Sequence, residues 1–140
     1  MQIPSKDDVQ LLAQVGFLAA GRGDAAAALR IFEALALLRP DRAFAYVGQA
    51  TALLNAGRAG EAAQRLQAVH LPAGSEADML DTFKGLALQL AERRSESTYV
   101  LRRVASRARQ AGATEGALLA ARLLGEDLVT VSSPEPVLSI

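Results

Sequence analysis

The chain of 140 residues offers few side chains for acid, base or metal chemistry. It has no cysteine and one histidine, His70, which excludes disulfides, thiolate catalysis and a zinc site built from cysteines or paired histidines. His70 stands at a predicted helix end, where we expect its ring to bond a terminal carbonyl. Neighbouring carboxylates occur at Asp7-Asp8 and Glu126-Asp127, but adjacent helical residues point apart, and acids near helix ends usually cap the helix or face water. We therefore expect no enzyme activity, no cofactor and no metal site.

The charges of the chain balance, with 15 Lys plus Arg against 15 Asp plus Glu. This balance disfavours partners recruited by bulk electrostatics, such as duplex nucleic acid or an anionic membrane. Basic residues outnumber acids between Lys84 and Arg109. We interpret the Arg93 to Arg109 surface as the solvated side of a helix, with contact to an acidic protein as the alternative. Nucleic acid is disfavoured there because Tyr99 is the single aromatic residue able to stack on a base. Whether this surface is a second binding site stays open.

The first ten residues, MQIPSKDDVQ, have neither the basic part nor the apolar part of a secretory signal. No apolar run approaches the roughly 20 residues of a membrane span. Almost all basic residues are arginine, as in proteins from GC-rich bacterial genomes. We expect a cytoplasmic bacterial protein.

The composition favours helix, because alanine and leucine make up more than a third of the chain and aromatic residues only 4%. Apolar residues recur at helical spacing, and no segment alternates with the period of a strand. We predict an all-α fold, with N-caps at Ser5, Asp24, Asp41 and Ser75, the first and last followed by an acid three residues later. Glycine and proline separate seven predicted helices: 6–20, 24–38, 42–56, 59–70, 75–90, 95–110 and 114–124.

The sequence repeats itself with a period of 34 residues and then of 35. Small residues recur in two columns, where the helices of a pair are expected to approach closely, and large residues recur in two others, where they should fill the core. The small columns are Gly16, Ala50, Gly85 and Ala28, Ala62, Ser97; the large columns are Phe32, Leu66, Leu101 and Leu35, Val69, Val104.

These columns resemble those of the tetratricopeptide repeat (TPR). The first repeat carries the family's residues Gly16, Gly23, Ala28, Phe32 and Pro40, whereas the third repeat departs from the pattern and lacks the closing proline. The resemblance implies three helix-turn-helix pairs that form a short right-handed superhelix, followed by a C-terminal capping helix. The alternative is a generic bundle of helices with short loops.

The resemblance also implies the domain organisation. One TPR-like helical domain covers residues 1–128, with repeats at about 9–42, 43–76 and 78–111 and a capping helix at about 114–124 that covers the exposed face of the last pair. Residues 129–140 contain two prolines and no helical period, so we expect a flexible C-terminal tail, with a docked β or polyproline II segment as the alternative.

TPR proteins bind ligands on the inner face made by the first helix of each pair, and here that face would be apolar. Members that clamp a peptide carboxylate place Lys and Asn where this chain has Ala13 and Phe17, so that clamp is not expected. An amphipathic helix or an extended apolar segment is the expected ligand, and Phe44 and Val47 are expected to be partly exposed. The alternative is that these side chains pack between repeats. The groove residues are Phe17, Phe44, Val47, Thr51, Leu54, Met79 and Leu86.

The segments Leu11 to Arg39 and Tyr46 to Gly60 resemble the small TPR chaperones of bacterial type III secretion systems. This resemblance implies a non-enzymatic chaperone that sequesters an aggregation-prone needle, translocator or export-apparatus subunit in the groove. The alternative is a generic TPR adaptor unrelated to secretion. A homodimer, or a heterodimer with a second small chaperone, is compatible with either. The identity of the client and whether the groove is open or filled by the tail stay undecided.

Overall fold

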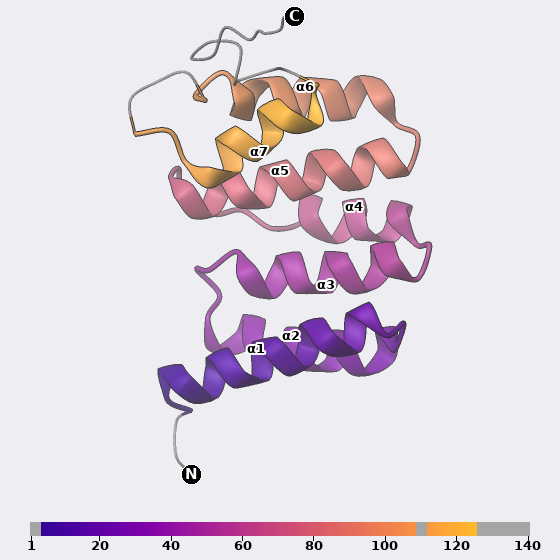
Figure 1. Cartoon of the computed structure of the whole chain (residues 1–140), viewed down its shortest axis with the longest axis vertical. Helices are drawn as coiled ribbons and strands as arrows, with labels where there is room; N and C mark the ends of the chain where they lie inside the picture. Colours follow the sequence, from indigo (N-terminus) through magenta and orange to yellow (C-terminus); the bar gives the residue numbers. More distant parts are fainter. Residues whose placement is uncertain (1–3, 109–111, 126–140) are drawn as a thin grey trace, which may run out of the picture.

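The computed structural model describes residues 4–108 and 112–125, and over these residues it consists of helices and short connections without strands (Figure 1). The prediction of an all-α chain with seven helices is confirmed for this part. The helices are α1 (Lys6–Gly21), α2 (Ala25–Leu38), α3 (Phe44–Asn55), α4 (Ala59–Gln67), α5 (Ser75–Leu90), α6 (Arg94–Ala105) and α7 (Glu115–Leu123).

Two helix starts follow the predicted capping chemistry. The Ser5 hydroxyl accepts a hydrogen bond from the Asp8 backbone N–H at 3.1 Å, and the Asp8 carboxylate accepts one from the Ser5 N–H at 3.2 Å, which completes a capping box. The Asp24 carboxylate accepts a hydrogen bond from the Ala27 N–H at 3.1 Å and caps α2.

The other two predicted caps are wrong. The Ala43 N–H at the start of α3 donates to the carboxylate of Glu76, at 2.6 Å, and Asp41 does not cap the helix. Ser75 is the first residue of α5, after Gly74, and no side chain caps that helix. The acceptor for α3 therefore comes from α5, a neighbour in space that no local sequence pattern reveals.

The largest differences from the predicted helix bounds are at the ends of α4 and α6. Helix α4 ends at Gln67, so His70 lies in the following loop, and α6 runs from Arg94 to Ala105. The predicted continuation of α6 is wrong for residues 106–108, which form a turn, and its last two residues lie outside the described part of the chain. Glu126-Asp127 and the tail 129–140 also lie outside this part.

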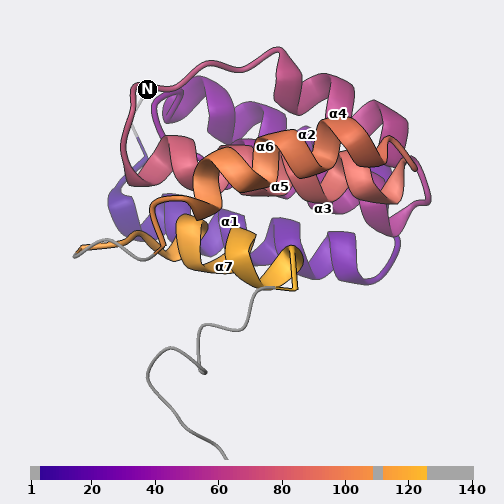
Figure 2. The same ribbon diagram turned by 90° about the horizontal axis from the view of Figure 1, so that it is seen from above.

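The helices stack in chain order, with α1 at one end and α6 and α7 at the other (Figure 1). Each odd-numbered helix packs against the helix that follows it and against the next odd-numbered helix, while each even-numbered helix packs against the odd-numbered helix after it. Figure 2, viewed along the stack, places α1 and α7 on one side and α4 on the other. This connectivity is that of stacked helix hairpins, and it lines up the odd-numbered helices along one face.

The core of the first two hairpins is built around Phe32, which is fully buried. Gly16 of α1 and Gly48 of α3 lie on two sides of its ring. A Cβ atom added at Gly16 would lie 2.8 Å from the nearest ring carbon, and one added at Gly48 would lie 2.3 Å from the nearest one. Glycine is thus required at both positions for this close packing. Leu66 and Leu101, the residues in the same repeat column, are each 1% exposed, as the column predicts.

The third hairpin repeats this packing. Gly85 of α5 faces Leu101 of α6, and an added Cβ would lie 2.4 Å from that leucine. Ser97 takes the place of alanine in its column, and its buried hydroxyl donates to the Gly85 carbonyl at 2.7 Å, so the polar group is satisfied.

No helix within residues 4–108 and 112–125 combines the length and hydropathy that crossing a membrane requires.

Candidate functional site

Two adjoining depressions run along the face of the odd-numbered helices, and together we call them the groove. They have volumes of about 340 and 300 Å³ and share three lining residues, Phe17, Arg42 and Phe44. The first is also lined by Lys6, Val9, Gln10, Ala13 and Arg39, and the second by Ala43, Val47, Ser75, Glu76, Met79, Glu115 and Gly116.

The floor of the groove is apolar and is fixed by the core beneath it. Phe17 is 39% exposed, and its ring lies against the ring of Phe32, with 4.6 Å between centroids and an interplanar angle of 60°. Phe44 is half-buried and packs against the same part of the core. The core residue Phe32 therefore holds the groove residue Phe17 in place.

Charged side chains surround this floor unevenly. The first depression is lined by three cations, Lys6, Arg39 and Arg42, and by no acid. The second has Glu76 and Glu115 beside Arg42, and Arg42 Nε lies 3.3 Å from Glu76 Oε1. The groove is thus apolar with a cationic end, which suits a segment that combines apolar and acidic side chains.

Sequence reasoning missed these flanking charges. Arg39 and Arg42 lie in the connection between α2 and α3, and Lys6 begins α1. The signal was present in the RPDR run of residues 39–42, but only the packing of α1 beside this connection brings Lys6 to the same depression.

Helix α7 forms one wall of the second depression through its first two residues, Glu115 and Gly116. Gly116 packs so tightly on α5 that an added Cβ would lie 2.6 Å from the backbone of Asp78 and Met79. Thr82 of α5 is fully buried, and its hydroxyl lies 2.7 Å from the Gly116 carbonyl and 2.8 Å from that of Asp78. The docking of α7 on α5 thus shapes one wall of the groove.

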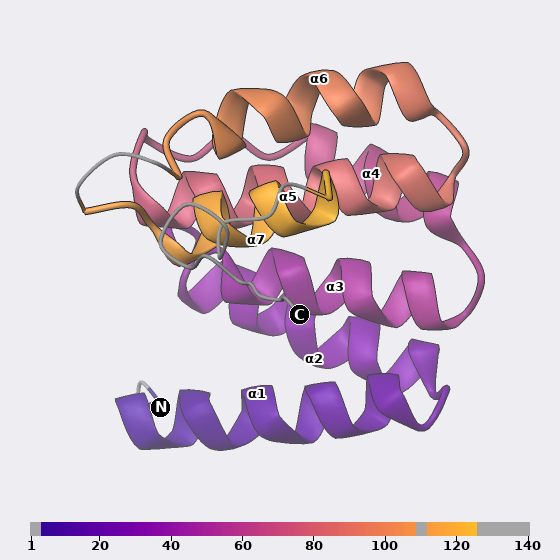
Figure 3. The same cartoon turned by 45° about the horizontal axis from the view of Figure 1, so that its top comes forward.

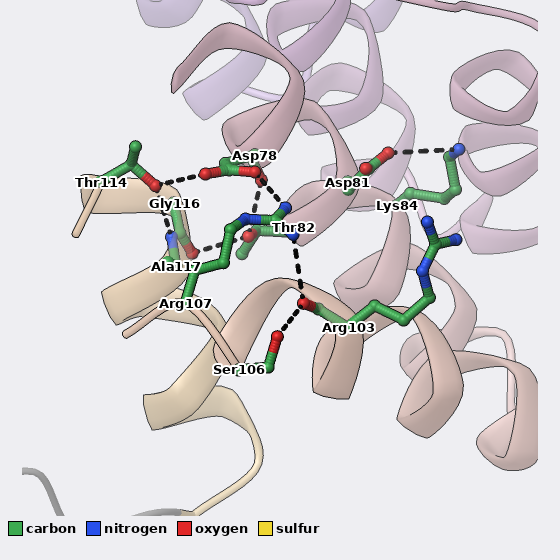
Figure 4. A network of polar contacts seen from close by, with 10 residues as sticks. All are labelled: Asp78, Asp81, Thr82, Lys84, Arg103, Ser106, Arg107, Thr114, Gly116 and Ala117. Atoms are coloured by element: carbon green, nitrogen blue, oxygen red, sulfur yellow. Dashed lines mark hydrogen bonds and ion pairs between the residues drawn. The ribbon is translucent and has the colours of Figure 1, made fainter. Parts of the chain in front are cut away.

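A buried carboxylate strengthens this docking (Figure 4). Asp78, 3% exposed, accepts hydrogen bonds from the Arg107 guanidinium and, at 2.6 Å, from the Thr114 hydroxyl that caps α7. Burial raises the pKa of Asp78, but the hydrogen bonds from Arg107 and Thr114 and the positive charge of Arg107 outweigh burial and lower its pKa from the ordinary value. Asp78 was predicted as part of a cap on α5, and its observed role is to join α5 to the residues around α7.

The seven predicted groove residues divide into two groups. Phe17, Phe44, Val47 and Met79 line the second depression together. Val47 is only 8% exposed, so the expectation of its partial exposure is wrong: its side chain faces the core between α3 and α5.

The other three line neither depression. Thr51 is half-buried and donates its hydroxyl to the Val47 carbonyl at 2.8 Å, and Leu54 packs against the central core. Leu86 is half-buried on α5.

The basic surface on α6 is only partly solvated. Arg107 is half-buried and bound to the buried Asp78, which departs from the expected solvated face, whereas Arg93 pairs with Glu96 at 2.6 Å and is exposed. Arg102 and Arg103 are exposed, and the Arg103 guanidinium lies 5.8 Å from the centre of the Tyr99 ring. Arg109 lies outside the described residues.

The residues considered for acid, base or metal chemistry do not converge. His70 is exposed in the loop after α4, and Asp8 belongs to the cap of α1. Across residues 4–108 and 112–125, no three His, Asp or Glu side chains are grouped so as to hold a metal ion.

Comparison of the chain with models of protein families, with curated protein sequences and with solved structures gives no match in any of the three.

Proposed function

We propose that this protein is a non-enzymatic binding protein that holds an apolar segment of a protein client in the groove. The observation that carries the proposal is the continuous apolar floor, where Phe17 remains 39% exposed although its ring rests on a rigid core. An apolar surface that stays partly open to water favours occupation by apolar side chains of a partner.

We further propose that the stacked hairpins are tetratricopeptide repeats in a short right-handed superhelix, with α7 as the capping helix. The support is the repeat of small and large residues along the sequence, together with the packing of each odd-numbered helix on the next. On this proposal the groove is the inner face of the array, formed by α1, α3, α5 and α7.

Among binding proteins, we propose a chaperone of a type III secretion subunit, on the sequence resemblance of residues 11–39 and 46–60. The mechanism would be sequestration. The groove covers the apolar segment through which client molecules assemble, so the concentration of free client stays below the level at which it aggregates, and the client is released at the export machinery. A generic adaptor would use the same groove, but its partner would be soluble alone.

Site-specific photocrosslinking in the cells that make the protein tests this function. A benzophenone amino acid replaces Phe44 in the groove or, as a control, Leu37, which is 85% exposed on α2. We expect the Phe44 position to crosslink to a small protein that precipitates when it is produced alone. Equal crosslinking from both positions would contradict the groove, and a partner that is soluble alone would favour the adaptor.

A further inference from the structure

The outer side of α1 carries apolar residues that the fold leaves exposed. Leu11, Val15 and Leu18 are 61%, 45% and 56% exposed, and their spacing of four and three residues places them on one face of the helix. The buried residues of α1, among them Gly16 and Ala20, lie on the opposite face, toward α2 and α3. Figure 3 shows α1 at the end of the stack, with one long side uncovered.

Charges of opposite sign stand at the two ends of this apolar row. Asp7 lies in the first turn of α1, four residues before Leu11, and Arg22, the residue that follows α1, lies four residues after Leu18, so the helical spacing places both at the ends of the same row. Within residues 4–108 and 112–125, neither Asp7 nor Arg22 takes part in an ion pair. We call Asp7, Leu11, Val15, Leu18 and Arg22 the α1 stripe.

The α1 stripe is complementary to itself when one copy is reversed. In an antiparallel pair of α1 helices related by a two-fold axis, Leu11 of each copy faces Leu18 of the other. Asp7 then faces Arg22 of the second copy, and symmetry makes each of these contacts twice. A parallel pair would instead place Asp7 beside Asp7 and Arg22 beside Arg22.

We propose that the protein forms a two-fold symmetric dimer through antiparallel packing of the α1 stripe. The occupant of this surface is thus a second copy of the chain. The groove residues Phe17 and Ala13 lie on a different side of α1, so both grooves stay accessible in the dimer. An interface built on one helix from each copy is small, and its dissociation constant is expected in the range of about 1 to 100 µM.

Sedimentation velocity on the full chain between about 1 and 500 µM, at low salt, tests the dimer. We expect the wild type to pass from monomer to dimer over this range and Leu18→Glu to raise the dissociation constant by about tenfold or more, because it places a carboxylate against Leu11. Leu37→Glu is the matched control, an equally drastic change on α2 outside the stripe, and should leave dimerisation unchanged. A wild type that stays monomeric at about 500 µM, or a Leu18→Glu variant that dimerises normally, overturns the proposal.

Charge exchange tests the antiparallel arrangement itself. Asp7→Arg and Arg22→Asp each place like charges together in their own dimers, so each variant alone should dimerise about threefold or more weakly than the wild type. Mixed in equal amounts, the two variants should form a mixed dimer in which both pairs are again opposite in charge. Circular dichroism melts of each variant verify that α1 is folded, and failure of the folded variants to pair with one another overturns the antiparallel arrangement.

Discussion

At the scale of single residues, the fold depends on a few large side chains held between small ones. Phe32 shows this best, because glycines from α1 and α3 lie on either side of its ring and the ring of Phe17 rests on it. The sequence columns predicted Phe32 and Gly16, since close helix packing requires large and small partners at a fixed spacing, but they did not include Gly48, which lies closest to the ring. They did not reveal that Phe32 also supports the groove.

Phe32→Ala should therefore lower the free energy of unfolding by about 3 to 5 kcal/mol, from lost burial and from the cavity left behind. Urea denaturation of the wild type and the variant measures the difference. Leu37→Ala, at a position that is 85% exposed, is the control and should change stability by no more than about 0.5 kcal/mol. A loss below about 1 kcal/mol for Phe32→Ala would contradict the packing described here.

Gly116→Ala should also be destabilising, by about 1 to 3 kcal/mol, because the added Cβ would meet the backbone of α5 rather than a flexible side chain. Gly60→Ala in α4 is the matched control. No atom lies within 4 Å of a Cβ added there, so this change should stabilise by about 0.4 to 1 kcal/mol through the unfolded state. Thermal melts of both variants check the opposite signs. Equal effects would show that α7 does not dock closely on α5.

At the scale of helices, local patterns predicted which segments are helical but not all the groups that join them. Ser5 and Asp24 cap their own helices, as their neighbours in sequence indicated. Glu76 of α5 accepts a hydrogen bond from the Ala43 N–H at the start of α3, and Asp78 binds Arg107 and Thr114 from beyond α5. Such contacts join residues about 30 apart in the chain, and helical periodicity carries no information about them.

The Asp78 carboxylate should make the stability of the protein depend on pH. Its pKa is lowered in the folded state, so the stability that it contributes is present above the unfolded pKa of about 4 and is lost as the pH falls through the folded pKa. Asp78→Asn should cost about 1 to 3 kcal/mol at neutral pH, because the amide cannot accept all the hydrogen bonds of the carboxylate. The difference between wild type and variant should then shrink below about pH 4.

Urea denaturation at pH 7 and pH 3 measures this difference. Asp81→Asn on the same helix is the control, because Asp81 is half-buried and pairs with Lys84 three residues along α5, at 3.4 Å, and such pairs along a helix contribute about 0.2 to 0.5 kcal/mol. An Asp78→Asn variant as stable as Asp81→Asn at pH 7 would mean that the carboxylate does not hold α7 in place.

At the scale of the whole molecule, stacking of the hairpins aligns α1, α3, α5 and α7 and creates the groove. Of the residues predicted for an apolar inner face, four line the groove, and the other three line neither depression. The cations Lys6, Arg39 and Arg42 were not predictable, since they meet only when the connection after α2 lies beside the start of α1. The burial of Val47 between α3 and α5 could not be predicted either, because it depends on how closely neighbouring hairpins pack.

The proposed function requires that a client bind in the groove and not on the basic surface of α6. The client identified by crosslinking is produced together with the wild type, with Phe44→Glu or with Arg102→Glu/Arg103→Glu, and the amount of client that stays soluble is measured. Circular dichroism first verifies that each variant is folded. We expect the arginine variant to keep the client soluble and Phe44→Glu to lose this effect, because it places an unpaired carboxylate against apolar side chains of the client. Client kept soluble by Phe44→Glu but lost with the arginine variant would contradict the groove and assign binding to α6.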